Sequence, residues 1–281
     1  MAKVYEALRR AEEERKRRTG DEPKAEARVE WEPVAQTVTP SKPSLWKRIW
    51  RRGRNRKAGV ESNEINKRRI TMLQPDSNVA EQYRSLRGRL DALASQRPLK
   101  TLAVTSPLAG EGKTTAAINL AVVTALSVGR RVLLIDCDLR RPQIHKVFGL
   151  QPGYGLGEVL AGAASLDDAI HQVEGMQLDV LPVRGRSQNP SELLASETMK
   201  KLIEEVSGRY DRIILDTPAA LGLPDAKAVC DLCDGMVMVV RADKTSQQDV
   251  QTAVEVLDRR RILGLILNGA PSDRGRYGYT S

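Results

Sequence analysis

From about residue 71 onward, short apolar runs alternate with longer stretches whose apolar positions repeat at helical spacing. The apolar runs predict strands at 101–105, 131–135, 178–183, 212–215, 236–240 and 263–267. The helical spacing predicts helices near 79–94, 114–128, 156–173, 191–207, 224–232 and 246–260. Nearly continuous apolar strands that alternate with helices are typical of a parallel sheet covered on both faces. The pattern therefore predicts an α/β fold with a mostly parallel central sheet.

The first 70 residues follow a different pattern. A small amphipathic helix is predicted over 1–18, and the polar, proline-containing stretch 19–44 reads as a linker. Segment 45–57 then carries seven basic residues and no acidic one, and it holds two of the chain's three tryptophans. Indole rings and basic side chains together favour an inner-membrane surface or a protein partner, with a solvated basic linker as the alternative. We therefore predict a largely disordered tail over 1–70 and a single large domain over 71–281.

The charge of the chain sits in that tail. Residues 1–70 contain 20 Lys and Arg against 11 Asp and Glu, which equals the net +9 of all 281 residues. This asymmetry disfavours a uniformly basic nucleic-acid-binding fold, and no specific nucleic-acid partner is expected. No apolar run approaches the ~20 residues needed to cross a bilayer, and we find no secretion signal. A cytoplasmic protein is expected.

Three cysteines, at positions 137, 230 and 233, suit a reducing compartment, since an odd number cannot all pair within one chain. Cys230 and Cys233 form a C-x-x-C pair. No second Cys or His pair accompanies it, and the segment reads as a buried helix, so packing is favoured over metal or redox use.

The first predicted strand runs into a glycine-containing loop and then an apolar helix, the order that a phosphate cradle requires. Backbone N–H groups of such a loop turn toward phosphate oxygens, Lys113 adds a cation, and the hydroxyl of Thr114 can hold Mg²⁺. Pro107 stands where the usual G-x-x-x-x-G-K-[ST] pattern has its first glycine. The candidate nucleotide-binding residues of the loop are Ala109, Gly110, Glu111, Gly112, Lys113, Thr114 and Thr115.

Carboxylates follow two of the predicted buried strands. Asp136 and Asp138 come after the strand at 131–135, and Asp216 comes after the strand at 212–215. Ligands of open α/β sheets bind at the carboxyl ends of the strands, where Mg²⁺ and a phosphate-binding lysine would give these acids partners. Any one of them could instead cap the turn that follows it. Their coincidence with the loop favours a nucleotide site.

Together these motifs resemble the bacterial tyrosine kinase (BY-kinase) family, cytoplasmic autokinases that regulate capsule and exopolysaccharide production. The resemblance rests on the loop 109–114 (AGEGKT), on 135–142 (IDCDLRRP) and on 215–218 (LDTP), with similar connecting segments over roughly 77–281. The related chromosome-partitioning and division-site-positioning ATPases carry an additional lysine five residues before the main one, where this chain has Leu108. The implied fold is that of a P-loop NTPase.

The resemblance also implies roles for residues. ATP and Mg²⁺ would be the cofactors, with Lys113 neutralising the transferred phosphoryl group. Thr114, Asp138 and Asp216 would hold the metal, and Asp136 would act as base or orienting group for the tyrosine hydroxyl. Two further residues complete the implied site: Arg140 would steady a phosphate or an adjacent subunit, and Asn268 would contact adenine.

The same resemblance implies partners. Glu81, Arg84 and Arg87 match an element through which the family assembles rings, and Tyr277 and Tyr279 in the tail 271–281 would accept phosphate. A separate transmembrane activator or polysaccharide co-polymerase and a phosphotyrosine phosphatase would be further partners, and the kinase would associate peripherally with the inner membrane. The alternatives are a positioning ATPase that never phosphorylates tyrosine and a scaffold that binds ATP only to hold a ring together.

Overall fold

A computed structural model describes residues 72, 74–127 and 129–270 of the chain. The predicted tail over 1–70, the segment 45–57 and the tyrosines Tyr277 and Tyr279 lie outside these residues. The described part contains a seven-stranded sheet in the order β3-β4-β2-β5-β1-β6-β7. Its strands are β1 (Thr101–Thr105), β2 (Val132–Asp136), β3 (His171–Gln172), β4 (Leu178–Leu181), β5 (Arg212–Asp216), β6 (Gly235–Arg241) and β7 (Ile262–Asn268). All neighbouring strands pair in parallel except β3, which is antiparallel to β4.

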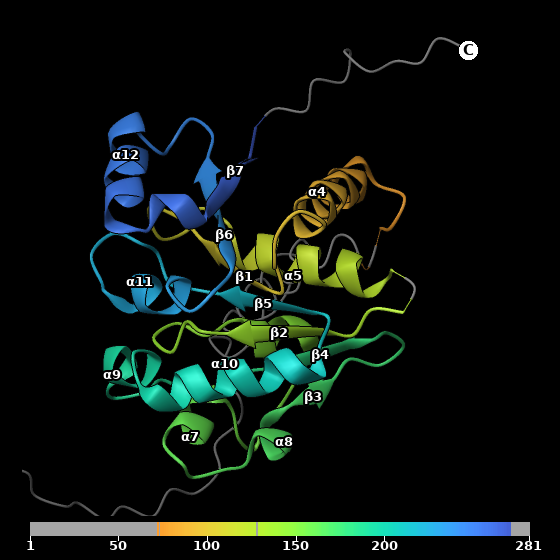
Figure 1. Cartoon of the computed structure of the whole chain (residues 1–281), viewed down its shortest axis with the longest axis vertical. Helices are drawn as coiled ribbons and strands as arrows, with labels where there is room; N and C mark the ends of the chain where they lie inside the picture. The colour runs from red at the N-terminus through yellow and green to blue at the C-terminus, as the bar shows by residue number, and fades with distance from the viewer. Residues whose placement is uncertain (1–71, 73, 128, 271–281) are drawn as a thin grey trace, which may run out of the picture. The chain divides into compact units, whose positions relative to one another are not determined.

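Helices cover both faces of this sheet (Figure 1). One face packs against α4 (Asn78–Ala94), α5 (Lys113–Ala125) and α6 (Ile144–Phe148). The other face packs against α7 (Leu156–Leu160), α8 (Leu166–Ala169), α9 (Pro190–Leu194), α10 (Glu197–Arg209), α11 (Asp225–Cys230) and α12 (Gln247–Val256). Successive residues of β1 alternate between the two cores, with Leu102 and Val104 in one and Ala103 in the other. This two-sided burial explains why the strands read as continuous apolar runs.

The six strands expected from the sequence are all present, and the mostly parallel sheet is confirmed. Two expected long helices are wrong as single helices. The stretch 156–173 divides into α7, α8 and β3. Gly162, just after α7, has a left-handed backbone conformation (φ +71°) that ends this helix, and Ser165 caps the next one. The stretch 191–207 divides into α9 and α10, where the Ser196 hydroxyl caps α10 by accepting from the Met199 amide.

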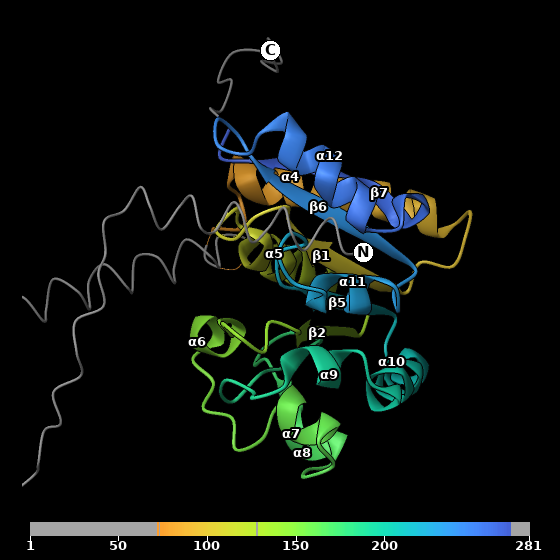
Figure 2. The ribbon, with the colours of Figure 1, turned by 90° about the vertical axis from the view of Figure 1, so that its left-hand side faces the viewer.

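Helix α5 is apolar on almost every side, and its residues from Ala116 to Ala125 are all buried. The sheet covers one side of it and α4 covers another, so that α5 lies inside the domain (Figure 2). A helix held this firmly fixes the position of the loop that precedes it.

The carboxyl ends of β1, β2 and β5 meet at one edge of the sheet. Asp136 ends β2 and Asp216 ends β5, and the two residues are direct partners in the parallel register. In the described part of the chain, we find no helix long and apolar enough to span a membrane.

Candidate active site

The loop between β1 and α5 takes a shape that depends on two glycines. Gly110 has φ +84° and Gly112 has φ +99°, both in the left-handed region that disfavours other residues. A Cβ atom on Gly112 would lie 2.1 Å from Nδ2 of Asn268, which itself donates to the Glu111 carbonyl at 2.8 Å. Asn268, at the end of β7, therefore holds the backbone of the loop from outside.

A buried carboxylate braces the same loop from within. Glu111 is only 4% exposed and accepts the Leu108 amide at 2.7 Å and the Thr245 hydroxyl. Arg241 adds a hydrogen bond from its guanidinium to the Gly110 carbonyl at 3.1 Å. The loop is thus tied to the segment after β6, a connection that the sequence pattern did not reveal.

Lys113 begins α5 and extends toward the acidic ends of the strands. Its ammonium lies 3.1 Å from Oδ2 of Asp138, and both side chains are mostly buried. Burial alone would lower the pKa of Lys113, but Asp216, Asp138 and Asp136 together hold that pKa above its usual value. The lysine is therefore a fixed cation at the start of the helix.

Asp136 and Asp216 lie beneath this pair, and both are almost fully buried. Asp136 accepts the backbone amides of Asp138, Gln143 and Ile144, each at 3.1 Å. Burial, together with the charge of Asp216, nevertheless raises the pKa of Asp136 to about 7. The two carboxylates give the site an excess of negative charge that a single lysine does not balance.

A cavity of about 630 Å³ opens above the loop. It is lined by the predicted residues Ala109, Gly110, Gly112, Lys113, Thr114, Thr115, Asp138 and Asn268, and also by Arg141, Gln143, Ala219, Arg241 and Gly269. The structure thus brings most of the predicted loop residues together with Asp138, which lies in the loop after β2. Sequence analysis missed Arg141, Gln143, Ala219, Arg241 and Gly269. Arg141, next to Arg140 in the IDCDLRRP segment, is the one that its motif could have suggested.

Several predicted residues stay outside that lining. Glu111, Asp136 and Asp216 lie underneath it. Arg140 instead turns to the neighbouring helices, where its Nε donates to Asp225 at 2.7 Å and one Nη donates to Ser191 at 3.0 Å. Asp136 and Arg140 therefore shape the loop after β2 in this conformation, and neither faces the cavity.

The predicted assembly residues lie on α4. Glu81 and Arg84 form an exposed ion pair of 2.8 Å, whereas Arg87 donates to the Val123 carbonyl of α5 at 2.7 Å. The described residues hold no cluster of three or more His, Cys, Asp or Glu side chains suited to a metal ion. Cys230 and Cys233 are buried free thiols, consistent with their expected role in packing.

Known proteins share the sequence and the fold of this chain. Residues 99–261 match the family model described as AAA domain. The chain is 40% identical over 213 residues to the tyrosine-protein kinase YwqD of Bacillus subtilis (strain 168). The alignment covers 75% of this chain and 90% of that protein. The chain belongs to the bacterial tyrosine kinase family. The kinase domain of the Escherichia coli tyrosine kinase ETK has a similar structure, with a TM-score of 0.69 and 32% identity over 75% of this kinase and 83% of that chain.

A third relative is longer than this kinase. The succinoglycan biosynthesis transport protein ExoP of Rhizobium meliloti (strain 1021) is 34% identical over 229 residues, which cover 75% of this kinase and 29% of that protein. The family resemblance, the P-loop fold and the tyrosine kinase activity expected from the sequence are thus confirmed, and this family of domains implies nucleotide binding.

Proposed function

We propose that this kinase uses ATP and Mg²⁺ to phosphorylate Tyr277 and Tyr279 of a neighbouring subunit in a ring, and thereby regulates polysaccharide synthesis and export. The observation that carries the proposal is the Lys113–Asp138 pair in the lining of the nucleotide cavity. A cation with a carboxylate beside it is the arrangement that phosphoryl transfer needs, and the pair supports the proposal in this way.

The cavity suits the phosphate groups of ATP, because positively charged and N–H donor groups line it. The loop amides at the start of α5 and the ammonium of Lys113 face one region, and the N-terminal end of a 13-residue helix favours negative charge there. Arg141 and Arg241 also line the cavity and extend the positive wall. Asn268, which borders the same space, supports the expected contact with the base.

The donor set fits Mg²⁺ as well. Thr114 and Asp138 line the cavity, with Asp216 beneath, and hydroxyl and carboxylate oxygens are the ligands that this ion prefers. Mg²⁺ usually binds through one or two protein groups and substrate phosphates, which agrees with the lack of a protein-only metal cluster among the described residues. When bound, the ion would neutralise phosphate charge and compensate the excess of acidic groups.

Lys113, Asp138 and Asp136 would then have different roles in the transfer. Lys113 would stabilise charge on the transferred phosphoryl group, and the Asp138 carboxylate at the cavity wall would bind Mg²⁺. Asp136, with a pKa near 7, has the basicity of a proton acceptor, but it now binds the amides of the loop over residues 138–144. A role as base or as orienting group would therefore require this loop to open, because in either role the carboxylate must reach the tyrosine hydroxyl.

The biological setting is part of the same proposal. ExoP is named for succinoglycan biosynthesis and transport, which supports a role beside polysaccharide synthesis. We propose a separate transmembrane activator, with residues 1–57 as its contact or as an inner-membrane contact, and a phosphotyrosine phosphatase that resets the tail. Unchanged membrane recruitment after deletion of residues 1–57 would contradict that contact.

The decisive experiment compares phosphotyrosine in the full chain isolated from its host with three variants. Lys113→Met should lower phosphotyrosine at least ~100-fold, because it removes one charged stabiliser of the transferred group. The variant with both Tyr277→Phe and Tyr279→Phe should also lose the signal while still binding ATP. Lys200→Met, on the exposed side of α10, is the matched control and should retain the signal.

An experiment that mixes two variants distinguishes phosphate transfer between subunits from transfer within one subunit. A Lys113→Met chain with an intact tail should gain phosphate from a chain whose two tail tyrosines are Phe. Wild-type chain without phosphotyrosine, in cells that actively make polysaccharide, would favour a positioning or scaffold ATPase.

A further inference from the structure

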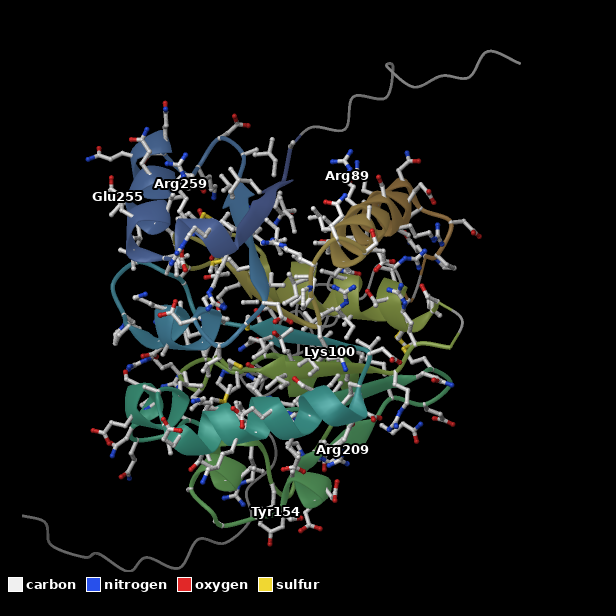
Figure 3. The ribbon with its side chains drawn as sticks, in the orientation of Figure 1. Arg89, Lys100, Tyr154, Arg209, Glu255 and Arg259 are labelled. Atoms are coloured by element: carbon white, nitrogen blue, oxygen red, sulfur yellow. The ribbon has the colours of Figure 1, made fainter. Side chains whose placement is uncertain are left out.

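A second cavity, of about 440 Å³, lies at the opposite edge of the sheet from the nucleotide site. It sits at the amino ends of β1, β2 and β5, where Lys100 precedes β1 (Figure 3). Its lining combines Lys100, Arg130 and Arg212 with Asp211 and with the apolar residues Ala94 and Leu99. The lining thus holds three basic side chains and one acidic side chain.

Arg212 is the central residue of this cavity. Its side chain is only 6% exposed, and its Nη2 lies 3.1 Å from Oδ1 of Asp91. Its Nη1 is buried and has no hydrogen-bond partner among the described residues. A guanidinium carries five N–H donors in a fixed plane, and buried donors of this kind are nearly always satisfied. Arg212, which lines the cavity, therefore has N–H donors on Nη1 that no described residue accepts.

The nearby acidic groups do not supply the missing partner. Arg130 places its own Nη1 2.6 Å from the same Oδ1 of Asp91, so that two guanidinium groups share one oxygen. Asp211 accepts the backbone amide of Arg131 at 2.8 Å, and Asp234 accepts the amides of Lys100 and Thr101.

Two further observations concern the basic side chains of this lining. The ammonium of Lys100 donates to the carbonyl of Ser207, a neutral acceptor, at 2.7 Å. Burial lowers the pKa of Arg212, and the charge of Arg130 adds to that effect against the opposing charges of Asp91 and Asp234. An anion in the cavity would relieve the repulsion between Arg130 and Arg212.

We propose that this cavity binds a phosphate group, held by Arg212, Arg130 and Lys100. The paired guanidinium groups suit the oxygens of phosphate, since their N–H donors can form parallel charge-assisted hydrogen bonds. Ala94 and Leu99 add an apolar wall beside the basic one. The occupant is inorganic phosphate or the phosphate of a small monoester, and the two share the same recognition chemistry.

The test is equilibrium dialysis of radiolabelled inorganic phosphate against the full chain at constant ionic strength. Every protein carries Lys113→Met, which weakens phosphate binding at the nucleotide loop. Arg212→Gln and Arg130→Gln should each weaken phosphate binding at least about tenfold, because each removes a charged donor. Arg89→Gln, which changes an exposed arginine of α4 outside the cavity, should bind like its parent (Figure 3).

The outcomes decide the proposal and the occupant. Equal phosphate binding in Arg130→Gln, Arg212→Gln and their parent, or no saturable binding in the parent, would overturn it. Thermal unfolding checks that each variant is folded, and if Arg212→Gln is not, Arg130→Gln and Lys100→Gln decide. Phenyl phosphate is then added as a competitor, with phenol as its control: tighter binding than inorganic phosphate indicates a monoester, and equal or weaker binding indicates free phosphate.

Discussion

Arg140 and Asp225 form a 2.7 Å ion pair that joins the loop after β2 to the first turn of α11. The Asp225 side chain is fully buried, whereas Arg140 is about one-third exposed (37%). Ser191, at the start of α9, donates to Asp225 as well, and α9 and α11 lie side by side (Figure 1). Because Arg140 is two residues from Asp138, the pair anchors the loop that presents Asp138 to Lys113.

Loss of this pair should destabilise the kinase in a pH-dependent way. Burial alone would raise the pKa of Asp225, but hydrogen bonds from Arg140 and Ser191 hold that pKa below its usual value. The unfolded chain therefore takes up the proton first as pH falls, so the stabilisation is present above about pH 4 and is lost below it. We expect Asp225→Asn to lower the free energy of unfolding by about 2 kcal/mol at pH 7 and by much less near pH 3.

Urea unfolding at several pH values measures this difference. Asp231→Asn, which removes the acid of an exposed ion pair with Lys227 in the same region, is the matched control and should change stability little at any pH. A constant loss for Asp225→Asn across the whole pH range would show that the charge of Asp225 is not the cause.

Gly112→Ala should impair nucleotide binding more than it impairs folding. The new Cβ would need a left-handed backbone and would lie 2.1 Å from the Asn268 amide, so the loop must shift away from β7. We expect at least about a tenfold loss of ATP affinity, since the loop amides would no longer converge on the phosphates. Titration with a fluorescent ATP analogue measures it.

Gly88→Ala is the control for that substitution. Gly88 lies inside α4 with open space around its Cα, so alanine there should leave ATP affinity unchanged and stabilise the helix by about 0.5–1 kcal/mol. Equal affinity of Gly112→Ala and wild type would contradict the tight contact with Asn268.

Glu111 should stabilise the loop through the two hydrogen bonds that its carboxylate accepts. Glu111→Ala would leave the Leu108 amide without its acceptor and would free the Thr245 hydroxyl, at a cost of about 1–3 kcal/mol in unfolding free energy. Glu111→Gln keeps the shape and one acceptor and should cost less. Thermal and urea unfolding should show this order, with the exposed Glu204→Ala unchanged. A Gln variant as unstable as the Ala variant would indicate that the charge of Glu111, and not its hydrogen bonds, matters.

The sequence predicted those parts of the fold and site that depend on residues close together in the chain. A strand buried on both faces must be apolar, which revealed β1, β2 and β4 to β7, and a phosphate loop needs its glycines and lysine next to one another. Strand β3 has only two residues and carries no such signal. The breaks that separate α7 from α8 and α9 from α10 depend on single capping residues inside stretches that are otherwise helical in pattern.

Long-range contacts explain the rest of what sequence reasoning missed. Arg241 reaches Gly110 and Asn268 reaches Glu111 only because β6 lies beside β1 and β7 lies beside β6 in the sheet order. Arg140 was expected to steady a phosphate or an adjacent subunit, but in the structure it pairs with Asp225, more than 80 residues later in the chain. No spacing rule relates such positions, since the fold alone brings them together.

The two sides of α4 should respond differently to mutation. Arg87 donates to the Val123 carbonyl, near the end of α5, so Arg87→Ala should lower the unfolding free energy by about 1–2 kcal/mol. Glu81 is exposed and forms an ion pair with its helical neighbour Arg84, so Glu81→Ala should leave stability nearly unchanged. If α4 forms the proposed ring contact, Glu81→Ala should nevertheless shift the assembly toward smaller species in sedimentation velocity with Mg²⁺ and ATP. Arg89→Ala, on the same helix, controls for loss of an exposed charge, and a ring that persists in Glu81→Ala would remove Glu81 from the interface.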